Sequence, residues 1–181
     1  MPAAGDDDID DAERLAAYAA RNKQAWQATI ADMNAISADR ADDGWETVTV
    51  AAGHTEPRPR EAGVTDRYGL VHVVSGSEAD SVASAHDAGS YPRYDVYRGT
   101  TATRIFLVTE CLDPESRTAV LVAGSVRRHD AGELARTAAR TGRMYTHIRT
   151  LDGTHVGSFE HASPEKFFPT TARTPPPDND D

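Results

Sequence analysis

The sequence predicts a single α+β domain in which a mainly antiparallel sheet has helices packed on one face and a long helix precedes the sheet. Three observations support this fold class. The chain has 181 residues, a usual length for one domain. Several runs with strand periodicity follow each other across short turns, which favours antiparallel pairing. A long stretch before them contains almost no helix breakers.

The long helix is predicted over residues 9–40, because apolar residues recur there every three or four positions. A helix of this length would measure roughly 45 Å, more than a small sheet can cover. One interpretation is a helix that serves self-association or binds a partner protein. The other is one helix packed on the domain, either continuous or broken in two. Its stripe consists of Leu15, Ala19, Asn22, Trp26, Ile30 and Met33.

The two ends of the chain differ from its middle in composition. Residues 1–8 are acidic and residues 170–181 are rich in proline and aspartate, so we expect both to be disordered tails. The domain then spans residues 9–169, with its sheet and remaining helices over 45–161.

The first elements after the long helix follow from alternation and turn signals. Residues 45–52 alternate as a half-buried strand, and residues 53–66 carry prolines and charges typical of a loop. A second strand ends at Ser75. A short helix, with Ser77 as its predicted cap, then runs to Gly89.

Three further strands are predicted in YPRYDVYRG, RIFLVTEC and RTAVLVAGSV. The last two are apolar on both faces, and Asp113-Pro114 between them is a strong turn former. A helix over 131–141 follows, with Asp130 as its predicted cap and Gly142 at its end.

The final hairpin is predicted from Asp152-Gly153, a dipeptide typical of two-residue turns, between alternating flanks. This turn places His147 opposite Ser158 and on the same face as Glu160. His155 and His161 fall on the other face. After the hairpin, SPEKFFP is expected to form a capped turn whose two phenylalanines fill an edge of the core.

This register decides what the hairpin histidines can do. A metal site built from all three is excluded, so the sequence predicts no metal ligand. His147, Ser158 and Glu160 remain as a polar strand face. A Ser-His-acid group needs a shielded site and oxyanion donors, which a flat strand face does not offer. We therefore predict a solvated face and no catalytic residue.

Arginines are concentrated in residues 127–149, whereas residues 1–47 are strongly acidic. Functionally, these arginines are a candidate anion or partner surface beside a helix start. The preferred interpretation is charge pairing within the chain or between subunits, because acidic residues already occupy that helix start. The candidate residues are Arg127, Arg128, Arg136 and Arg140.

The overall charge indicates a habitat. Acidic residues outnumber basic ones by 29 to 19, which gives a formal net charge of −10. Only Lys23 and Lys166 are lysines. An acidic surface poor in lysine stays hydrated when molar salt screens charge repulsion. We therefore expect a cytoplasmic protein of a salt-loving organism.

The sequence also limits the classes of site and partner. Cys111 is the single cysteine, so no disulfide within the chain and no multi-cysteine metal cage can form. No membrane partner is expected, because no apolar run is long enough to span a bilayer. Nucleic-acid binding is not expected, since arginine contacts to phosphate weaken at high salt. The Gly-Ser helix start at 76–77 is too weak a phosphate-binding signal to predict a cofactor.

Three segments, VLVAGSVRRHDAGELARTAARTG, THIRTLDGTHVGSF and EKFFP, together with the acidic composition, resemble an uncharacterised domain family of halophilic archaea. The resemblance covers roughly residues 10–170. It implies the habitat and a single domain, and it brings no activity, cofactor or functional residue.

Two functions of different class remain open. The preferred one is a non-enzymatic interaction or regulatory domain that uses the long helix and the arginine-rich region. The alternative is a small-molecule-binding domain or enzyme with a pocket between sheet and helices, and with His72, Arg128 or His147 at its rim.

Overall fold

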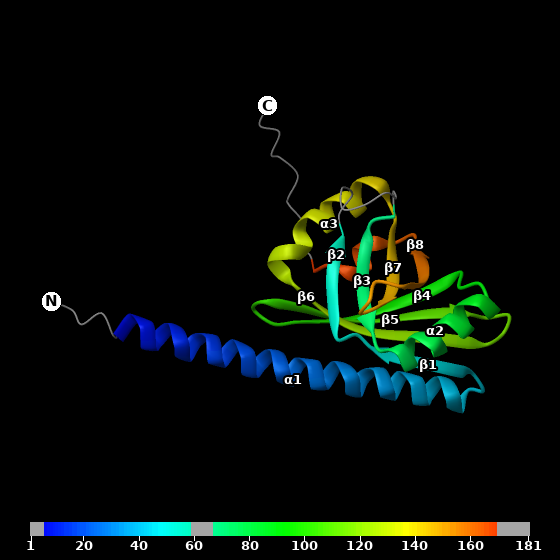
Figure 1. Ribbon diagram of the computed structural model, residues 1–181, viewed down its shortest axis with the longest axis horizontal. Helices are drawn as coiled ribbons and strands as arrows, with labels where there is room; N and C mark the ends of the chain where they lie inside the picture. Colours follow the sequence, from blue (N-terminus) through cyan, green and yellow to red (C-terminus); the bar gives the residue numbers. More distant parts are fainter. Residues whose placement is uncertain (1–5, 59–66, 170–181) are drawn as a thin grey trace.

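The structure is a computed structural model that describes residues 6–58 and 67–169. Within these residues the chain forms three α-helices, a short 3-10 helix and eight strands (Figure 1). The α+β class and the long N-terminal helix are confirmed. The strands are divided between two four-stranded sheets, a separation that alternation along one strand at a time cannot show.

The first sheet, called sheet A, has the strand order β1-β6-β5-β4. The central strands β5 (Arg104–Asp113) and β6 (Thr118–Arg127) form a long antiparallel hairpin, as their apolar faces predicted. β4 (Arg93–Thr100) lies antiparallel to β5 at one edge. At the other edge β1 (Glu46–Ala51) runs parallel to β6.

The second sheet, called sheet B, has the order β2-β3-β7-β8. β3 (Gly69–Val74) is parallel to β7 (Met144–Thr150), and β8 (His155–His161) is antiparallel to β7. β2 (His54–Arg58) is antiparallel to β3 at the opposite edge. Each sheet is therefore antiparallel apart from one parallel pair.

The prediction of a loop over 53–66 was wrong for its first part, which contains β2. Pro57 and three charged or titratable residues hid this strand. An edge strand tolerates proline, because one side of its backbone has no neighbouring strand to bond. Residues 59–66 of that loop lie outside the described part of the chain.

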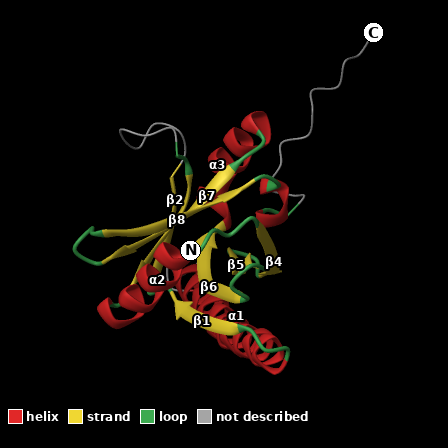
Figure 2. Ribbon diagram, turned by 90° about the vertical axis from the view of Figure 1, so that its right-hand side faces the viewer, coloured by secondary structure: helices red, strands yellow, loops and turns green. Residues whose placement is uncertain are grey.

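The core lies between the inner faces of the two sheets, and two helices close it. α2 (Gly76–Ala88) packs against residues of both sheets, including Val50, Val122 and Ile148. α3 (Arg128–Thr141) packs on another cluster with Leu107 and Phe167. Figure 2 shows these helices on opposite sides of the sheets. The 3-10 helix Pro164–Phe167 buries Phe167 and Phe168, as predicted.

α1 (Asp6–Asp42) is one continuous helix that lies on the outer face of sheet A. It begins before the predicted start at Ile9. Met33 is buried against Val108 and Leu121, and Trp26, Ile30 and Ile36 are partly buried beside it. The helix is held at its end by Arg40, whose Nε and Nη2 donate to the two oxygens of Glu110 at 3.0 Å.

Two predicted helix caps were wrong. The cap of α2 is Ser75, whose hydroxyl accepts from Glu78 N, because Ser75 has the extended backbone that a cap requires. α3 begins at Arg128, so Asp130 lies in its first turn rather than before it. Gly142 ends α3 in the left-handed conformation, as predicted.

Candidate functional site

The N-terminal half of α1 extends beyond the two sheets and the helices packed on them (Figure 1). Asn22 marks the point of departure, because its side chain bonds Thr101 and Thr103 in the turn between β4 and β5. Before that point, every side chain from Asp8 to Ala17 is exposed, including Ile9 at 57% and Leu15 at 67%. We call residues 8–21 the free half of α1.

The apolar stripe predicted for the long helix is therefore divided by the edge of sheet A. Trp26, Ile30 and Met33 contact the sheet, whereas Leu15 and Ala19 continue the same stripe in the free half. The free half also carries four acidic residues. Asp8 lies on the line of the stripe and Asp11 borders it, whereas Asp10 and Glu13 lie on the opposite side of the helix.

The candidate arginines lie at the end of β6 and along α3, which begins near the place where α1 leaves sheet A and runs away from α1 (Figure 1). Arg127, Arg136 and Arg140 are exposed. None of these three forms an ion pair within residues 6–58 and 67–169, so the pairing expected inside the chain is not made there. Arg128 is different, because its Nη1 donates to Thr101 O at 3.1 Å.

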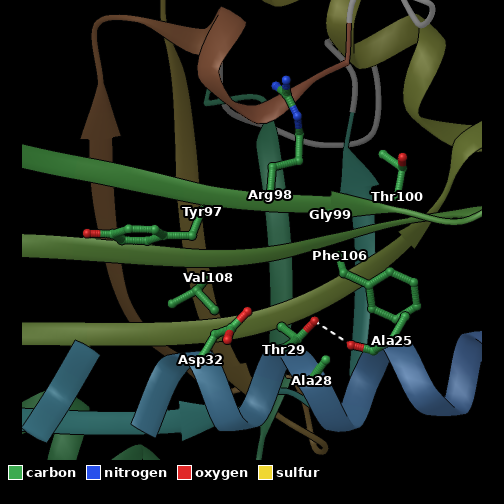
Figure 3. A pocket seen from close by; sticks show the side chains of 10 residues that line it. All are labelled: Ala25, Ala28, Thr29, Asp32, Tyr97, Arg98, Gly99, Thr100, Phe106 and Val108. Atoms are coloured by element: carbon green, nitrogen blue, oxygen red, sulfur yellow. Dashed lines mark hydrogen bonds between the residues drawn. The ribbon is translucent and has the colours of Figure 1, made fainter. Parts of the chain in front are cut away.

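A cavity of about 410 Å³ lies between α1 and the edge strand β4 (Figure 3). It exists because small residues face each other there: Ala25 and Ala28 on α1, and Gly99 on β4. Phe106 and Val108 form an apolar floor. The sticks in Figure 3 show Arg98 and Thr100 pointing away from α1. Thr29, Asp32 and Tyr97 also line the cavity, so it is not wholly apolar, although the Thr29 hydroxyl already donates to Ala25 O.

The hairpin register differs from the prediction at its turn. Thr150 N donates to Thr154 O, so the loop has three residues, Leu151 to Gly153. Gly153 takes the positive φ of +88° that this loop requires. Arg149 pairs with His155 and Ile148 with Gly157, which leaves Val156 as an extra bulged residue.

From Gly157 onward the bulge restores the predicted strand pairing. It also places His155 on the opposite face of sheet B from the predicted one. His147 is opposite Ser158, as predicted, and His161 lies on the buried face, as predicted. His155 was placed on the wrong face. Its ring centroid lies 6.1 Å from that of His147, because the bulge turns it toward the outer side of sheet B.

Ser158 lies between these two imidazoles. Its Oγ is 2.6 Å from His147 Nδ1 and 3.2 Å from His155 Nε2. The other nitrogen of His147, Nε2, is 2.8 Å from the backbone oxygen of Arg67. Tyr145 stacks on the His147 ring, with centroids 5.7 Å apart. Burial lowers the pKa of His147, against an opposing effect of the Arg67 carbonyl.

The predicted carboxylate of this face, Glu160, does not join the cluster. It is exposed and faces Arg143, with an N–O distance of 3.9 Å. The orienting role that an acid would have belongs instead to the Arg67 carbonyl. Arg67 had no sequence signal as a site residue, because a backbone oxygen is available at every position.

The interior contains two further histidines. His72 on β3 is fully buried, with Nδ1 2.9 Å from Thr55 Oγ1. It therefore does not line the rim of a pocket. His161 Nε2 is 2.7 Å from Thr146 Oγ1. Burial lowers the pKa of each of these imidazoles to about 3. Among the described atoms, His72 Nε2 and His161 Nδ1 have no hydrogen-bond partner.

Two general classes of site were checked over the described parts of the chain. No group of three or more metal-ligating side chains is found there. No helix in the same residues is both long and apolar enough to cross a membrane.

The chain was compared with protein families, curated proteins and solved structures. The model of a family described as a family of unknown function (DUF7529) matches residues 12–169. No curated protein matches the chain, and no solved structure does so either.

Proposed function

We propose that this chain, which belongs to a family of unknown function (DUF7529), is an interaction domain that pairs with a second copy of itself through the free half of α1. The observation that carries this proposal is the run of exposed side chains from Asp8 to Ala17 in an unbroken helix. The acidic composition supports a salt-rich cytoplasm as the place of this association.

The length and composition of the free half support a partner on the face that continues the buried stripe. From Asp6 to Arg21 the helix extends roughly 24 Å at the usual rise. An isolated helix of this length is marginal in water and gains most of its stability from packing of an apolar face. Leu15 and Ala19 continue the buried stripe, whereas Ile9 lies about 120° around the helix from Leu15.

A second copy fits because the free half is self-complementary when two copies run antiparallel. In a pair centred near Leu15, Asp8 of one copy lies close to the level of Lys23 of the other. The acidic first turns then meet the basic residues at the base of the helix. A symmetric contact of this kind closes as a dimer.

The exposed arginines extend the same complementarity. Arg127 lies near the level of Asn22, because Asn22 and the backbone of Arg128 both bond Thr103. The acidic end of the second copy's helix would therefore approach Arg127 of the first. Molar salt weakens such pairs, so we expect them to select the register and to contribute less to the affinity than the apolar contact does.

The expected affinity is modest. Burying Leu15 and the small Ala19 in both copies contributes on the order of 3–6 kcal/mol. Association costs about 4–15 kcal/mol in lost freedom. We therefore expect a reversible dimer with a dissociation constant on the order of micromolar or weaker.

Sedimentation equilibrium and native mass spectrometry in molar KCl test the proposal. The wild-type chain should change from monomer to dimer with increasing concentration. Leu15→Glu should weaken the dimer by roughly tenfold or more, because it buries an unpaired charge. Ala17→Glu is the matched control, since Ala17 lies about 200° around the helix from Leu15.

A chain that stays monomeric at every concentration would overturn the proposal. So would a dimer that tolerates Leu15→Glu as well as Ala17→Glu. The register has its own test: Arg127→Glu should weaken the dimer, and Asp8→Arg in the same chain should restore it. Without this rescue the proposed register is wrong, even if the chain self-associates.

A further inference from the structure

The hydroxyl of Ser158 is the group whose surroundings are least expected of a solvated sheet face. It lies at hydrogen-bond distance from two imidazoles that come from different strands, His147 on β7 and His155 at the start of β8. The bulge at Val156 creates this arrangement, because without it His155 would point to the other face.

The positions of the hydrogens in this cluster follow from the one group that can only accept a hydrogen bond. The carbonyl of Arg67 can only accept, so His147 Nε2 at 2.8 Å must carry a hydrogen. His147 Nδ1 is then the lone-pair nitrogen of the neutral ring, and Ser158 Oγ must donate to it at 2.6 Å. Since that hydroxyl has one hydrogen, His155 Nε2 donates to Ser158 Oγ at 3.2 Å.

We propose that Ser158 is a nucleophile that accepts the acyl group of small, activated carboxylic esters, with His147 as its general base. Nucleophile, base and orienting group stand in the relation that activates a serine hydroxyl. The orienting group is the Arg67 carbonyl. Tyr145 stacks on His147 and restricts rotation of the ring.

The reaction proceeds in two balanced steps. Ser158 Oγ attacks the ester carbon and its proton moves to His147 Nδ1, while the Nε2–H bond to Arg67 O stabilises the imidazolium. The carbon–oxygen bond to the leaving alcohol breaks, and the alcohol takes that proton. Water then attacks the acyl-serine, with His147 again as the base. The carboxylic acid is released and the serine is restored.

The open sheet face restricts the substrate class. The backbone N–H groups of the inner strand β7 serve the sheet ladder, and those of the edge strand β8 lie in the plane of the sheet rather than on the face that carries Ser158 and His147, so they do not form an oxyanion hole there. His155 is the neighbouring donor, and its ring is exposed. Without a strong oxyanion site the ester must be activated by a good leaving group, such as an aryl alcohol. The planar surface of Tyr145 and His147 suits an aromatic leaving group.

The test uses 4-nitrophenyl acetate with the full-length chain and locates the acetyl group by peptide mass mapping. Ser158 should be acetylated roughly tenfold or more faster than Ser81, an exposed helix serine, since a positioned general base has at least this effect. His147→Gln should abolish the difference, and Ser158→Ala should remove the fast release of nitrophenol. His54→Gln is the control, because His54 is an exposed histidine of the same sheet.

The pH profile distinguishes a base from a merely structural histidine. Because the pKa of His147 is lowered, fast acetylation of Ser158 should persist below pH 6.5 and fall only at more acid pH. Circular dichroism checks that each variant is folded. Equal labelling of Ser158 and Ser81 in the wild-type chain, or a profile without an acid limb, would overturn the proposal whether or not His147→Gln folds.

Discussion

Glu110 illustrates what one residue can decide in this protein. Its side chain is fully buried on the outer face of sheet A, beneath the end of α1. A buried carboxylate is stable only when it is paired and hydrogen-bonded, and the two parallel bonds from Arg40 provide this. The pair raises the pKa of Arg40, chiefly through the hydrogen bond to Glu110. It therefore fastens α1 to the sheet at one place.

Removing one partner of the Arg40–Glu110 pair should lower the free energy of unfolding more than replacing both partners. We expect Arg40→Met to lower the free energy of unfolding by about 2–4 kcal/mol, because it leaves a buried carboxylate unpaired. The value is below that of a fully enclosed pair, since 28% of the Arg40 side chain is exposed. The double variant Arg40→Met, Glu110→Leu should be less destabilised than Arg40→Met. Urea unfolding of the set checks this, and additive losses would contradict it.

The buried histidines make stability depend on pH. Each has a pKa of about 3 in the folded protein and about 6.5 when unfolded, so the unfolded chain binds more protons between these values. Their contribution is complete above about pH 6.5 and is lost progressively as the pH falls toward 3. The slope should be about 1.4 kcal/mol per pH unit for each ring.

Urea unfolding between pH 5 and 6.5 measures this slope where most carboxylates remain ionised. His161→Gln should reduce the slope, because one of the three imidazoles with a lowered pKa, His72, His147 and His161, no longer titrates. His54→Gln should leave it unchanged, since that ring is exposed. A wild-type stability that is constant over this interval would show that the interior rings are not held neutral.

At the scale of elements, the β7–β8 hairpin shows how one loop residue sets a site. The alternation of each strand was correctly recognised, but the number of residues in the loop was not. A third loop residue and the compensating bulge leave His147 opposite Ser158 and bring His155 to them. Sequence patterns of two- and three-residue loops with a glycine at the end are nearly identical, so the choice depends on packing across the strands.

The loop conformation predicts opposite effects for two glycine substitutions. Gly153→Ala should destabilise the protein by about 1 kcal/mol, because Gly153 has a φ of +88°. Gly132→Ala should stabilise it by about 0.5–1 kcal/mol, because Gly132 lies inside α3 and the added methyl group meets only ordinary contacts. Thermal unfolding of both variants tests the pair, and a stabilising Gly153→Ala would exclude this loop.

At the scale of the whole molecule, the net charge of −10 opposes compaction in dilute buffer. Added salt screens this repulsion, and the screening length falls to about 3 Å at molar concentration. We therefore expect the midpoint of thermal unfolding to rise when KCl is raised from dilute to molar concentration. Replacing Asp8, Asp10 and Asp11 by asparagine should reduce this gain. An equal or lower midpoint in molar KCl would remove the argument for a salt-rich habitat.

The sequence by itself determined the features that depend on neighbouring residues. Alternation and turn signals located β1 and β3, runs apolar on both faces located the β5–β6 hairpin, and Gly142 located the end of α3. The unusual length of α1 also followed from the sequence, as did the conclusion that a small sheet could not cover it. These properties follow from backbone geometry and turn chemistry over a few residues, which are the same wherever the segment lies.

Only the tertiary structure decided which segments meet. The parallel pairs β1–β6 and β3–β7 join strands far apart in the chain, and no local pattern distinguishes their partners. The same holds for Arg40 with Glu110, for Arg67 with His147, and for the edge at which α1 leaves sheet A. The physical reason is that burial and hydrogen bonding select among many long-range pairings that are locally equivalent, so contacts of this kind appear only when the two sheets are packed together.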